Sequence, residues 1–321
     1  MCSPNFWTAE KMTKEPRRYD VIIIGAGPAG LTAAIYSARA GLKTFVVDED
    51  AAGGQVKTTH MVGNYPGFVE PISGYQLSKN MRDQAERYGA HLEMVTDVTG
   101  LCLDCEDKWV ELEDDERVYS KFVIVATGRS PRKLLIPGEE ELKGHGLSYC
   151  ATCDGEFYAG KDVFVVGGGN SAIEESLLLL KHVNSITFIH QFDQFTATMK
   201  EEVEKILANP KVSVLWSHEP RSFALDGKSV VVEMENLKTR ERHTFTRDGV
   251  FIFVGMIPNS DPFKDTGLEM NNYGYVPTDE LMGTNLPGVY AVGDIRDKMT
   301  WQITTAVGEA TVAALEVVKK S

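Results

Sequence analysis

The feature that most constrains the fold is a segment that occurs twice. "YDVIIIGAGPAGLTAA" (residues 19–34) recurs as "KDVFVVGGGNSAIEES" (residues 161–176). Each copy starts with an apolar run typical of a buried parallel strand, continues through a glycine turn and ends in a helical pattern. A strand–turn–helix unit of this kind opens a dinucleotide-binding domain. The sequence therefore predicts an α/β protein with two dinucleotide-binding, Rossmann-like domains.

The segments that follow the two copies also correspond to each other. We expect the first helix to end near Gly41, before the strand "KTFVVDED", and the second to lead through "LLLLKH" to the strand "SITFIH". Residues 93–120 and 212–248 alternate enough to form antiparallel strands, and each region precedes an apolar run that ends in glycine. "GVYAVGD" and a helical pattern from about Thr305 to Val318 complete the chain. Both halves thus share one plan.

The charge and apolar content of the chain restrict its surroundings. The 46 acidic and 33 basic residues give a formal charge of −13, which argues against a nucleic-acid partner and against anionic membrane surfaces. No apolar run approaches the roughly 20 residues of a membrane span. Residues 1–18 read as a short disordered or tag-like lead-in without a signal peptide, so we predict a soluble, cytoplasmic protein.

The first glycine turn has the composition of a nucleotide site. Gly25, Gly27 and Gly30 form G-x-G-x-x-G between the strand and the helix. In such a turn one glycine bends the chain, one lets the backbone approach a pyrophosphate, and one allows close packing of helix on strand. Asp48 ends the next strand 23 residues after Gly25, which is close to the spacing of a ribose-binding carboxylate. The alternative for Asp48 is a solvated side chain in the acidic turn "DED".

The second glycine turn has the same register. Gly167, Gly169 and Ala172 form G-x-G-x-x-A, again between strand and helix. The next strand ends at His190, which lies 23 residues after Gly167, as Asp48 does after Gly25. His190 therefore occupies the ribose-reading position, and Gln191 beside it can hydrogen-bond a ribose.

Four of the five cysteines fall in two C-x-x-C pairs, and the fifth is Cys2. An odd number without an export signal does not suggest a framework of structural disulfides. Cys150 and Cys153 in "SYCATCDG" can close a small disulfide in which one thiolate attacks and the other resolves, while Asp154 manages the proton. The alternative is a pair of buried, reduced cysteines.

The other pair, Cys102 and Cys105, lies in a strand-like stretch. Positions i and i+3 of a strand point to opposite faces, and no glycine or helix start follows to lower a thiol pKa. We therefore expect these two side chains to serve packing. A zinc site built from all four cysteines has no supporting motif, and we predict no metal site.

Taken together, these motifs make the chain resemble the low-molecular-weight thioredoxin reductase family of FAD enzymes. The resemblance runs from about Tyr19 to Val318. It rests on the order and spacing of "GAGPAG", "GGQ" (53–55), "NYPG" (64–67), "ATG" (126–128), "CATCDG", "VVGGGNSAIEE" and "AVGD" (291–294). No second cysteine pair lies near the C-terminus, so the larger class of thioredoxin reductase does not fit.

The resemblance implies a domain organisation and a set of site residues. It implies an FAD-binding domain formed by residues 19–131 and 256–321, with an NAD(P)-type domain at 132–255 inserted into it that carries the redox-active cysteines, and a homodimer. It also implies rotation of one domain against the other. In the family the second cysteine faces the flavin and the first attacks thioredoxin, which assigns these roles to Cys153 and Cys150, with Asp154 as proton donor. The FAD would be held by Gly25, Gly27, Gly30, Gln55, Asn64, Thr127, Gly293, Asp294 and Gln302, in addition to Asp48.

The chain departs from the family pattern at two places. Trp301, Gln302 and Ile303 stand where the family often has Arg-Gln-Ala, so the indole either covers the cofactor or fills a gap in the core. Gln191, Phe192 and Thr196 stand where the family typically has three arginines that grip the 2′-phosphate of NADPH. Use of NAD(P)H is therefore open: the donor can be NADH, NADPH held in another way, ferredoxin or a deazaflavin.

These observations predict an FAD-dependent disulfide reductase. It would pass two electrons through FAD and Cys150/Cys153 to thioredoxin or a thioredoxin-like protein, with an electron donor other than ordinary NADPH. Two alternatives stay open from the sequence. One is a flavin-dependent dithiol oxidase acting on a small molecule, and the other is a non-catalytic flavin redox sensor.

Overall fold

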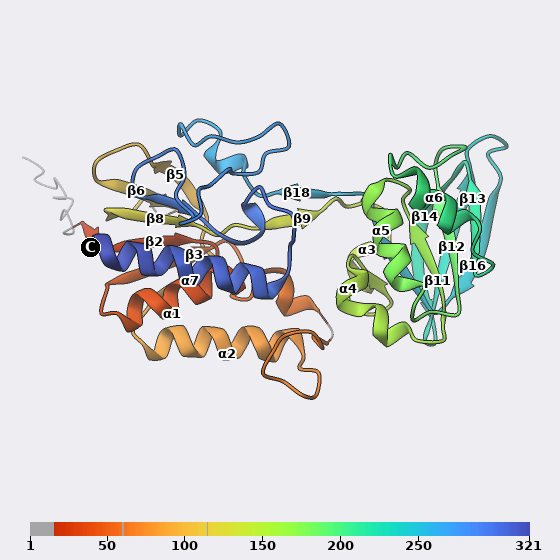
Figure 1. Cartoon of the computed structure of the whole chain (residues 1–321), viewed down its shortest axis with the longest axis horizontal. Helices are drawn as coiled ribbons and strands as arrows, with labels where there is room; N and C mark the ends of the chain where they lie inside the picture. The colour runs from red at the N-terminus through yellow and green to blue at the C-terminus, as the bar shows by residue number, and fades with distance from the viewer. Residues whose placement is uncertain (1–15, 60, 114) are drawn as a thin grey trace, which may run out of the picture.

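The structure is a computed structural model, and it describes residues 16–59, 61–113 and 115–321. It has two lobes, which Figure 1 shows side by side and joined by strands β9 (Arg129–Pro131) and β18 (Met256–Pro258). The two strands pair with each other in antiparallel register, so the outgoing and returning chain form one narrow ribbon between the lobes.

The first lobe is built on a parallel five-stranded sheet. Its strands, in the spatial order β19-β8-β2-β3-β4, are β19 (Val289–Ala291), β8 (Phe122–Val125), β2 (Val21–Ile24), β3 (Thr44–Asp48) and β4 (His91–Met94). Helices α1 (Pro28–Arg39), α2 (Gly74–Arg87) and α7 (Ile303–Lys320) lie together on one face of this sheet (Figure 1). The central strands are buried on both faces because each face is covered, as their unbroken apolar sequences predict.

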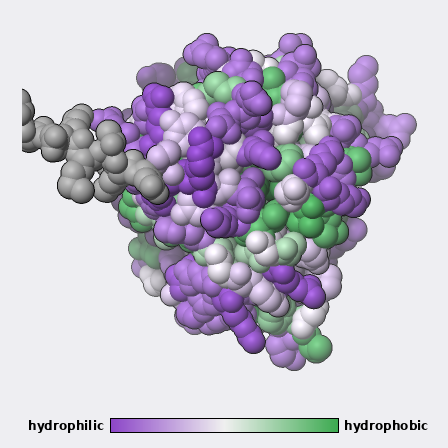
Figure 2. Space-filling view, turned by 90° about the vertical axis from the view of Figure 1, so that its left-hand side faces the viewer, coloured by the Kyte–Doolittle hydropathy of each residue, from purple (hydrophilic) through white to green (hydrophobic). Residues whose placement is uncertain are grey.

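A second, mostly antiparallel sheet covers the face of the parallel sheet that lies opposite the three helices. It consists of β1 (Arg17–Arg18), β7 (Arg117–Ser120), β6 (Lys108–Leu112) and β5 (Val98–Cys102), in that order. The short helices η1 (Gly54–Thr58), η3 (Asp261–Phe263) and η4 (Gly293–Ile295) belong to the connecting segments. Figure 2 shows the end of this lobe. Most of the side chains on that face are hydrophilic, and some hydrophobic side chains form a continuous patch.

The second lobe repeats this plan. Its parallel sheet has the order β10-β17-β11-β12-β13, formed by β10 (Leu147–Ser148), β17 (Gly249–Ile252), β11 (Asp162–Val166), β12 (Ser185–His190) and β13 (Val212–Trp216). The helices are α3 (Glu139–Leu142), α4 (Ala151–Asp154), η2 (Gly155–Tyr158), α5 (Asn170–Leu179) and α6 (Lys200–Leu207). An antiparallel sheet of β14 (His218–Asp226), β15 (Ser229–Asn236) and β16 (Arg242–Arg247) completes it.

The predicted α/β class with two Rossmann-like units is confirmed, and α1 ends just before Gly41 as expected. Two strand assignments were wrong. Glu93 and Met94 belong to parallel β4, and residues 212–216 form parallel β13, although both regions were expected to be antiparallel. The reason is physical: a half-exposed edge strand shows the same alternation of polar and apolar residues in either direction.

The expected lead-in falls mostly outside the described residues, as does Cys2. Arg17 and Arg18, its last residues, are ordered as β1 and pair in parallel with β7. None of the helices in the described part of the chain is long and apolar enough to span a bilayer.

Candidate functional site

The first glycine turn connects β2 to α1 and is sterically closed on one side. Gly25 has a φ of +108°, and a Cβ there would collide with the carbonyl oxygen of Ala126, which directly follows the neighbouring strand β8. A Cβ on Gly30 would collide with the Gly25 carbonyl. A Cβ on Gly27, by contrast, would meet its nearest atom 3.9 Å away, at Gly54. The backbone before α1 therefore faces open space, which fits a pyrophosphate at this helix N-terminus.

Asp48 holds this turn from the adjacent strand. Its Oδ2 accepts a hydrogen bond from the Ala26 N–H at 2.6 Å, and its Oδ1 accepts one from the Asp50 N–H at 2.9 Å. Burial raises the pKa of Asp48, and these hydrogen bonds offset part of that effect. The carboxylate is therefore bound to the protein and not simply solvated in its acidic turn.

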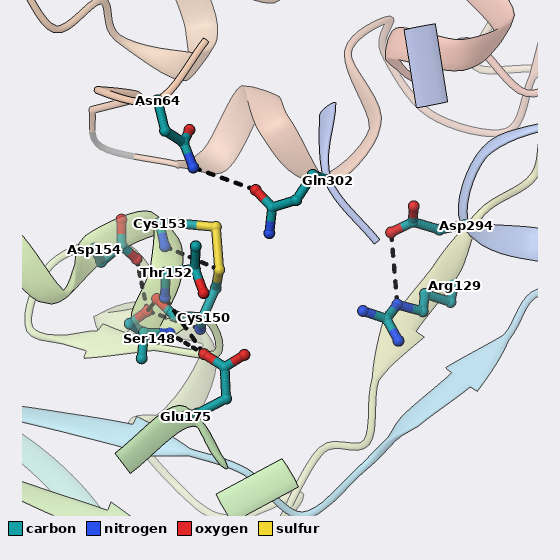
Figure 3. The surroundings of a disulfide bond; sticks show 11 residues. Asn64, Arg129, Ser148, Cys150, Thr152, Cys153, Asp154, Glu175, Asp294 and Gln302 are labelled. Atoms are coloured by element: carbon teal, nitrogen blue, oxygen red, sulfur yellow. Dashed lines mark hydrogen bonds and ion pairs between the residues drawn. A yellow bond between two sulfur atoms is a disulfide. The ribbon is translucent and has the colours of Figure 1, made fainter. Parts of the chain in front are cut away.

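Four further residues that are expected to bind FAD contact one another or the segments at the interlobe ribbon. Gln55 donates from Nε2 to the carbonyl of Arg129, the first residue of β9. Asn64 donates to Gln302 Oε1 at 3.2 Å, a contact drawn in Figure 3. Thr127 donates from Oγ1 to the Asn259 carbonyl at 2.8 Å. Segments distant in sequence thus converge where the first lobe faces the second.

Asp294 lies in η4 in a cluster of charges. Burial raises its pKa, although Lys298 Nζ lies 3.7 Å away and Arg129 Nε 3.5 Å away. Glu309 of α7 accepts the Gly293 N–H at 2.8 Å and pairs with Lys298 at 3.1 Å. Arg129, Lys298 and Glu309 were not predicted from the sequence. Only the position of Arg129, directly after "ATG", could have drawn attention to it.

Trp301 packs against this cluster. The Arg129 guanidinium lies over its ring, 4.3 Å from the centroid, and the Tyr275 ring lies 5.7 Å away. The indole Nε1 is buried and has no hydrogen-bond partner among the described residues. An indole N–H usually finds a partner when it is buried, so this donor fits a site that a polar ligand completes.

Cys150 and Cys153 form a disulfide at the start of α4 (Figure 3). Both are half-buried, and Cys150 Sγ accepts the Cys153 N–H at 3.1 Å. Backbone N–H groups at a helix start stabilise a thiolate by donating hydrogen bonds to it. The local geometry therefore suits thiol–disulfide exchange.

Ser148 connects this disulfide segment to Asp154. Its Oγ lies 2.6 Å from Asp154 Oδ2 and accepts the Cys150 N–H at 3.1 Å. The Asp154 N–H also donates to the Cys150 carbonyl at 3.1 Å. Asp154 is thus held beside Cys150 both through Ser148 Oγ and through its own backbone N–H. Ser148 was not anticipated, because its role follows from the bend between β10 and α4.

Glu175 of α5 is a second unanticipated residue. Its Oε2 accepts the N–H groups of Ala151 and Thr152, at 2.8 and 3.3 Å, at the beginning of α4. Burial raises the pKa of Glu175, while those two N–H groups and Arg129 act in the opposite direction. Figure 3 shows its carboxylate directed at the disulfide segment.

The two lobes meet beside the disulfide. A Cβ on Gly144 of the second lobe would lie 2.7 Å from the Thr58 carbonyl oxygen of the first. A Cβ on Gly63 would lie 3.9 Å from Glu156 Oε2 in η2. The disulfide and the Asn64–Gln302 pair consequently share one region of the molecule (Figure 3).

The second glycine turn connects β11 to α5 and is covered by a loop. Gly167 has a φ of +128°, while a Cβ on Gly169 would meet its nearest atom, Thr196 Oγ1, 3.9 Å away. The Thr196 N–H donates to the Gly168 carbonyl at 2.8 Å, and the Thr198 N–H donates to Asn170 Oδ1 at 2.8 Å. The loop after β12 is thereby tied to the turn and to the start of α5.

His190 ends β12 beside this turn, as its register predicts, but its ring is buried. It is 4% exposed, its Nε2 lies 3.0 Å from the Gln194 carbonyl, and burial lowers its pKa. A Cβ on Gly168 would lie 2.5 Å from the ring, and the rings of Phe195 and Trp216 pack on it. His190 thus belongs to an aromatic cluster that supports the turn.

The residues after His190 offer little positive charge to a ligand. Gln191 is exposed and the Phe192 side chain is 50% exposed. Asp193 accepts from Ser217 Oγ and pairs with Lys238 at 2.6 Å, so this lysine already has an anionic partner.

The packing role expected for Cys102 and Cys105 is corrected by the structure, which joins them in a disulfide. The expectation assumed that the strand continues through both residues. In fact β5 ends at Cys102, and the turn that follows brings Cys105 back beside it.

Comparisons with known proteins agree with this architecture. Residues 19–312 match the family model of the pyridine nucleotide-disulphide oxidoreductases. The chain is 42% identical to a 34.2 kDa protein in a rubredoxin operon of Clostridium pasteurianum, over 94% of this chain and 97% of that one. It is 40% identical to thioredoxin reductase of Bacillus subtilis, over 94% of this chain and 95% of that one. The thioredoxin reductase structure from Streptococcus pyogenes superposes with a TM-score of 0.88 at 38% identity, covering 95% of this chain and 98% of that one. The chain therefore belongs to the pyridine nucleotide-disulphide oxidoreductases, a family of FAD-binding enzymes.

Proposed function

We propose that this protein is a thioredoxin reductase that takes its electrons from a donor other than ordinary NADPH. The observation that carries the disulfide-reductase part is the Cys150–Cys153 disulfide at the start of α4, set against the lobe that contains the first glycine turn. Relatives that are named thioredoxin reductase support thioredoxin or a thioredoxin-like protein as the acceptor.

The first lobe is proposed to hold FAD. We assign residues 19–131 and 256–321 to the FAD-binding domain and residues 132–255 to the inserted domain. Gly25, Gly27, Gly30 and Asp48 would hold the pyrophosphate and ribose end. Gln55, Asn64, Thr127, Gly293, Asp294 and Gln302 would line the rest. Bound FAD supplies the step that brings two electrons from the donor to the disulfide.

The cysteines then carry the electrons onward. Once the pair is reduced, the Cys150 thiolate attacks the disulfide of thioredoxin, and the Cys153 thiolate attacks the resulting mixed disulfide. The Cys150–Cys153 disulfide re-forms, and thioredoxin leaves with two thiols once each of its sulfur atoms has taken up a proton, one of them from the solvent. Asp154, held by Ser148 Oγ at 2.6 Å, supplies a proton to the departing thiolate.

The proposal of an atypical electron donor rests on the residues beside the second glycine turn. Three charge-assisted hydrogen bonds at about 1.5 kcal/mol each correspond to roughly a thousandfold in affinity, and Gln191, Phe192 and Thr196 supply none of them. Thr196 is also engaged with the turn itself. A reduced ferredoxin-type protein or NADH is the proposed donor. The relative named after a rubredoxin operon is in keeping with a protein electron carrier.

Anaerobic mixing tests the donor. Oxidised holoenzyme is mixed with NADPH, NADH or reduced ferredoxin, and flavin bleaching is followed. Reduced ferredoxin or NADH should bleach the flavin within the turnover time, whereas micromolar NADPH should not. Fast bleaching by micromolar NADPH would refute the atypical donor and leave the reductase assignment intact.

A donor-free experiment tests the reductase. The flavin is photoreduced without oxygen, thiols are alkylated, and the alkylated positions are identified by mass spectrometry before and after addition of oxidised thioredoxin. We expect Cys150 and Cys153 to be alkylated before thioredoxin is added and protected afterwards. Uptake of two electrons without free thiols at these positions would instead support a redox sensor. Rapid oxygen consumption with a small dithiol, and no transfer to thioredoxin, would support the oxidase.

The homodimer expected from the family is tested by the mass of the holoenzyme in solution.

A further inference from the structure

The turn between β5 and β6 gathers three potential metal ligands far from the proposed catalytic site. Cys102 ends β5, and Asp104 and Cys105 follow in the turn. One ligand atom from each residue lies within 4.8 Å of the others, and this is the one such group of three found in the described part of the chain. Strands β5 and β6 lie on the side of the first lobe away from the second (Figure 1). The proposed function leaves this pair without a role.

The turn is held in shape by contacts that do not involve sulfur. Leu103, between the two cysteines, is fully buried in the core of the lobe. Lys108 Nζ donates to the Cys105 carbonyl at 3.2 Å, and Arg18 pairs with Asp107 at 2.9 Å. The two sulfur atoms would therefore remain close together if the disulfide were reduced, and a preformed ligand set favours binding of a metal ion.

Charge distinguishes this pair from Cys150 and Cys153. Cys150 Sγ accepts a backbone N–H at the start of α4. Cys102 Sγ instead lies 3.2 Å from Asp104 Oδ1. The turn carries three acidic residues, Asp104, Glu106 and Asp107. Among the residues that the structure describes, two cationic side chains contact it, Lys108 at the start of β6 and Arg18 from β1. Carboxylates disfavour a free thiolate but attract a cation, so this environment suits metal binding better than nucleophilic exchange.

We propose that the reduced pair, together with Asp104, binds a zinc-class divalent cation. Two thiolates and one carboxylate are ligands that zinc and cadmium accept, and water can take the fourth tetrahedral position. Binding replaces the two thiol protons by one cation. Because the pair is a disulfide in the structure, a dithiol reductant must first open it by thiol–disulfide exchange. The reductant gives up two electrons and becomes a disulfide itself, and Cys102 and Cys105 become two thiols. The site therefore holds a cation only in its reduced form.

Metal titration of the reduced holoenzyme tests the proposal. The Cys150→Ser/Cys153→Ser variant removes the other pair, so that Cys102, Cys105 and Cys2 are the remaining thiols. After anaerobic reduction and removal of the reductant, Cd²⁺ is added and the ultraviolet absorption of cadmium–thiolate bonds is followed. We expect one cation per chain and release of about two protons. Asp104→Asn in the same background should weaken binding about tenfold or more.

The matched control carries Cys102→Ser and Cys105→Ser as well and keeps Cys2. Equal binding by this control and its parent would overturn the proposal, as would equal binding by the oxidised and reduced parent. A second measurement uses the holoenzyme without substitutions after anaerobic reduction, in which Zn²⁺ should slow alkylation of Cys102 and Cys105 at least tenfold, as mapped by peptide mass. Unchanged alkylation at both positions would likewise overturn the site, whatever the folding of the variants.

Discussion

The two glycine turns share their first two glycines and their register but have different neighbours. At the first, Asp48 projects a carboxylate from the adjacent strand onto the turn backbone. At the second, His190 occupies the equivalent strand end with its ring buried under Phe195 and Trp216, and the loop through Thr198 is fastened to the turn. A glycine motif therefore specifies a backbone shape, while the strand that follows it decides what the shape can recognise.

The largest expected effect comes from giving the second turn the charges it lacks. The triple variant Gln191→Arg/Phe192→Arg/Thr196→Arg should bind NADPH roughly a thousandfold more tightly, because three charge-assisted hydrogen bonds become available to the 2′-phosphate. Flavin bleaching at graded NADPH concentrations measures the change. NADH is the control, since it has no 2′-phosphate. An equal gain for both nucleotides would show that the arginines do not read that phosphate.

At the first turn, the decisive change is Gly30→Ala. The second turn already has alanine at this motif position, Ala172, but at the first a Cβ would collide with the Gly25 carbonyl. Overpacking of this kind costs about 1–3 kcal/mol or more of unfolding free energy. The matched control is Gly27→Ala, whose Cβ meets nothing closer than 3.9 Å. Thermal unfolding should separate the two: Gly30→Ala lowers Tm, whereas Gly27→Ala keeps the apoprotein's Tm and loses FAD affinity. Equal losses of Tm would contradict this reading.

His190 should make folding of the second lobe sensitive to mild acid. Its pKa is lowered in the folded state from an ordinary value of 6.5, so the unfolded chain binds the proton more readily. The stabilisation is thus complete above pH 6.5 and is lost as the pH falls. His190→Phe should cost about 1 kcal/mol at pH 7.5, for the lost hydrogen bond to Gln194, and less at pH 5.5. Urea unfolding at both pH values measures this; a cost that does not shrink in acid would argue against a buried neutral ring.

Asp48 should produce a smaller effect of the opposite sign. Its folded pKa lies above the ordinary value of 3.8, so the folded state binds the proton more readily and the unfolding free energy falls as pH rises from that value. Asp48→Asn should flatten this part of the profile, by less than about 1 kcal/mol, because the amide oxygen can still accept the Ala26 N–H. Urea midpoints between pH 4 and pH 7 provide the measurement. An unchanged slope would show that Asp48 does not titrate in the fold as its burial implies.

Features that depend on residues close together in the sequence could be predicted, whereas contacts between distant segments could not. Gly25, Gly167 and the strand ends at Asp48 and His190 were predictable, because turn geometry and strand length are local. Glu175 was not, because it reaches the Ala151 N–H from a helix 24 residues away through packing of α5 on α4. Nor could the burial of His190 be foreseen, since Trp216 reaches it from another strand. The Cys102–Cys105 disulfide was not predicted because the alternating pattern does not show that β5 ends at Cys102.

The ribbon of β9 and β18 has a consequence for how such a molecule can be rearranged. Pro131 and Met256 are paired partners in it, so the chain leaves the first lobe and returns to it at one place. If residues 132–255 were excised, the two cut ends would already be neighbours, and a short linker would rejoin them at little entropic cost. The second lobe can therefore be exchanged as a unit. Another domain whose N- and C-termini lie close together can replace it without a change in the path of the first lobe's chain.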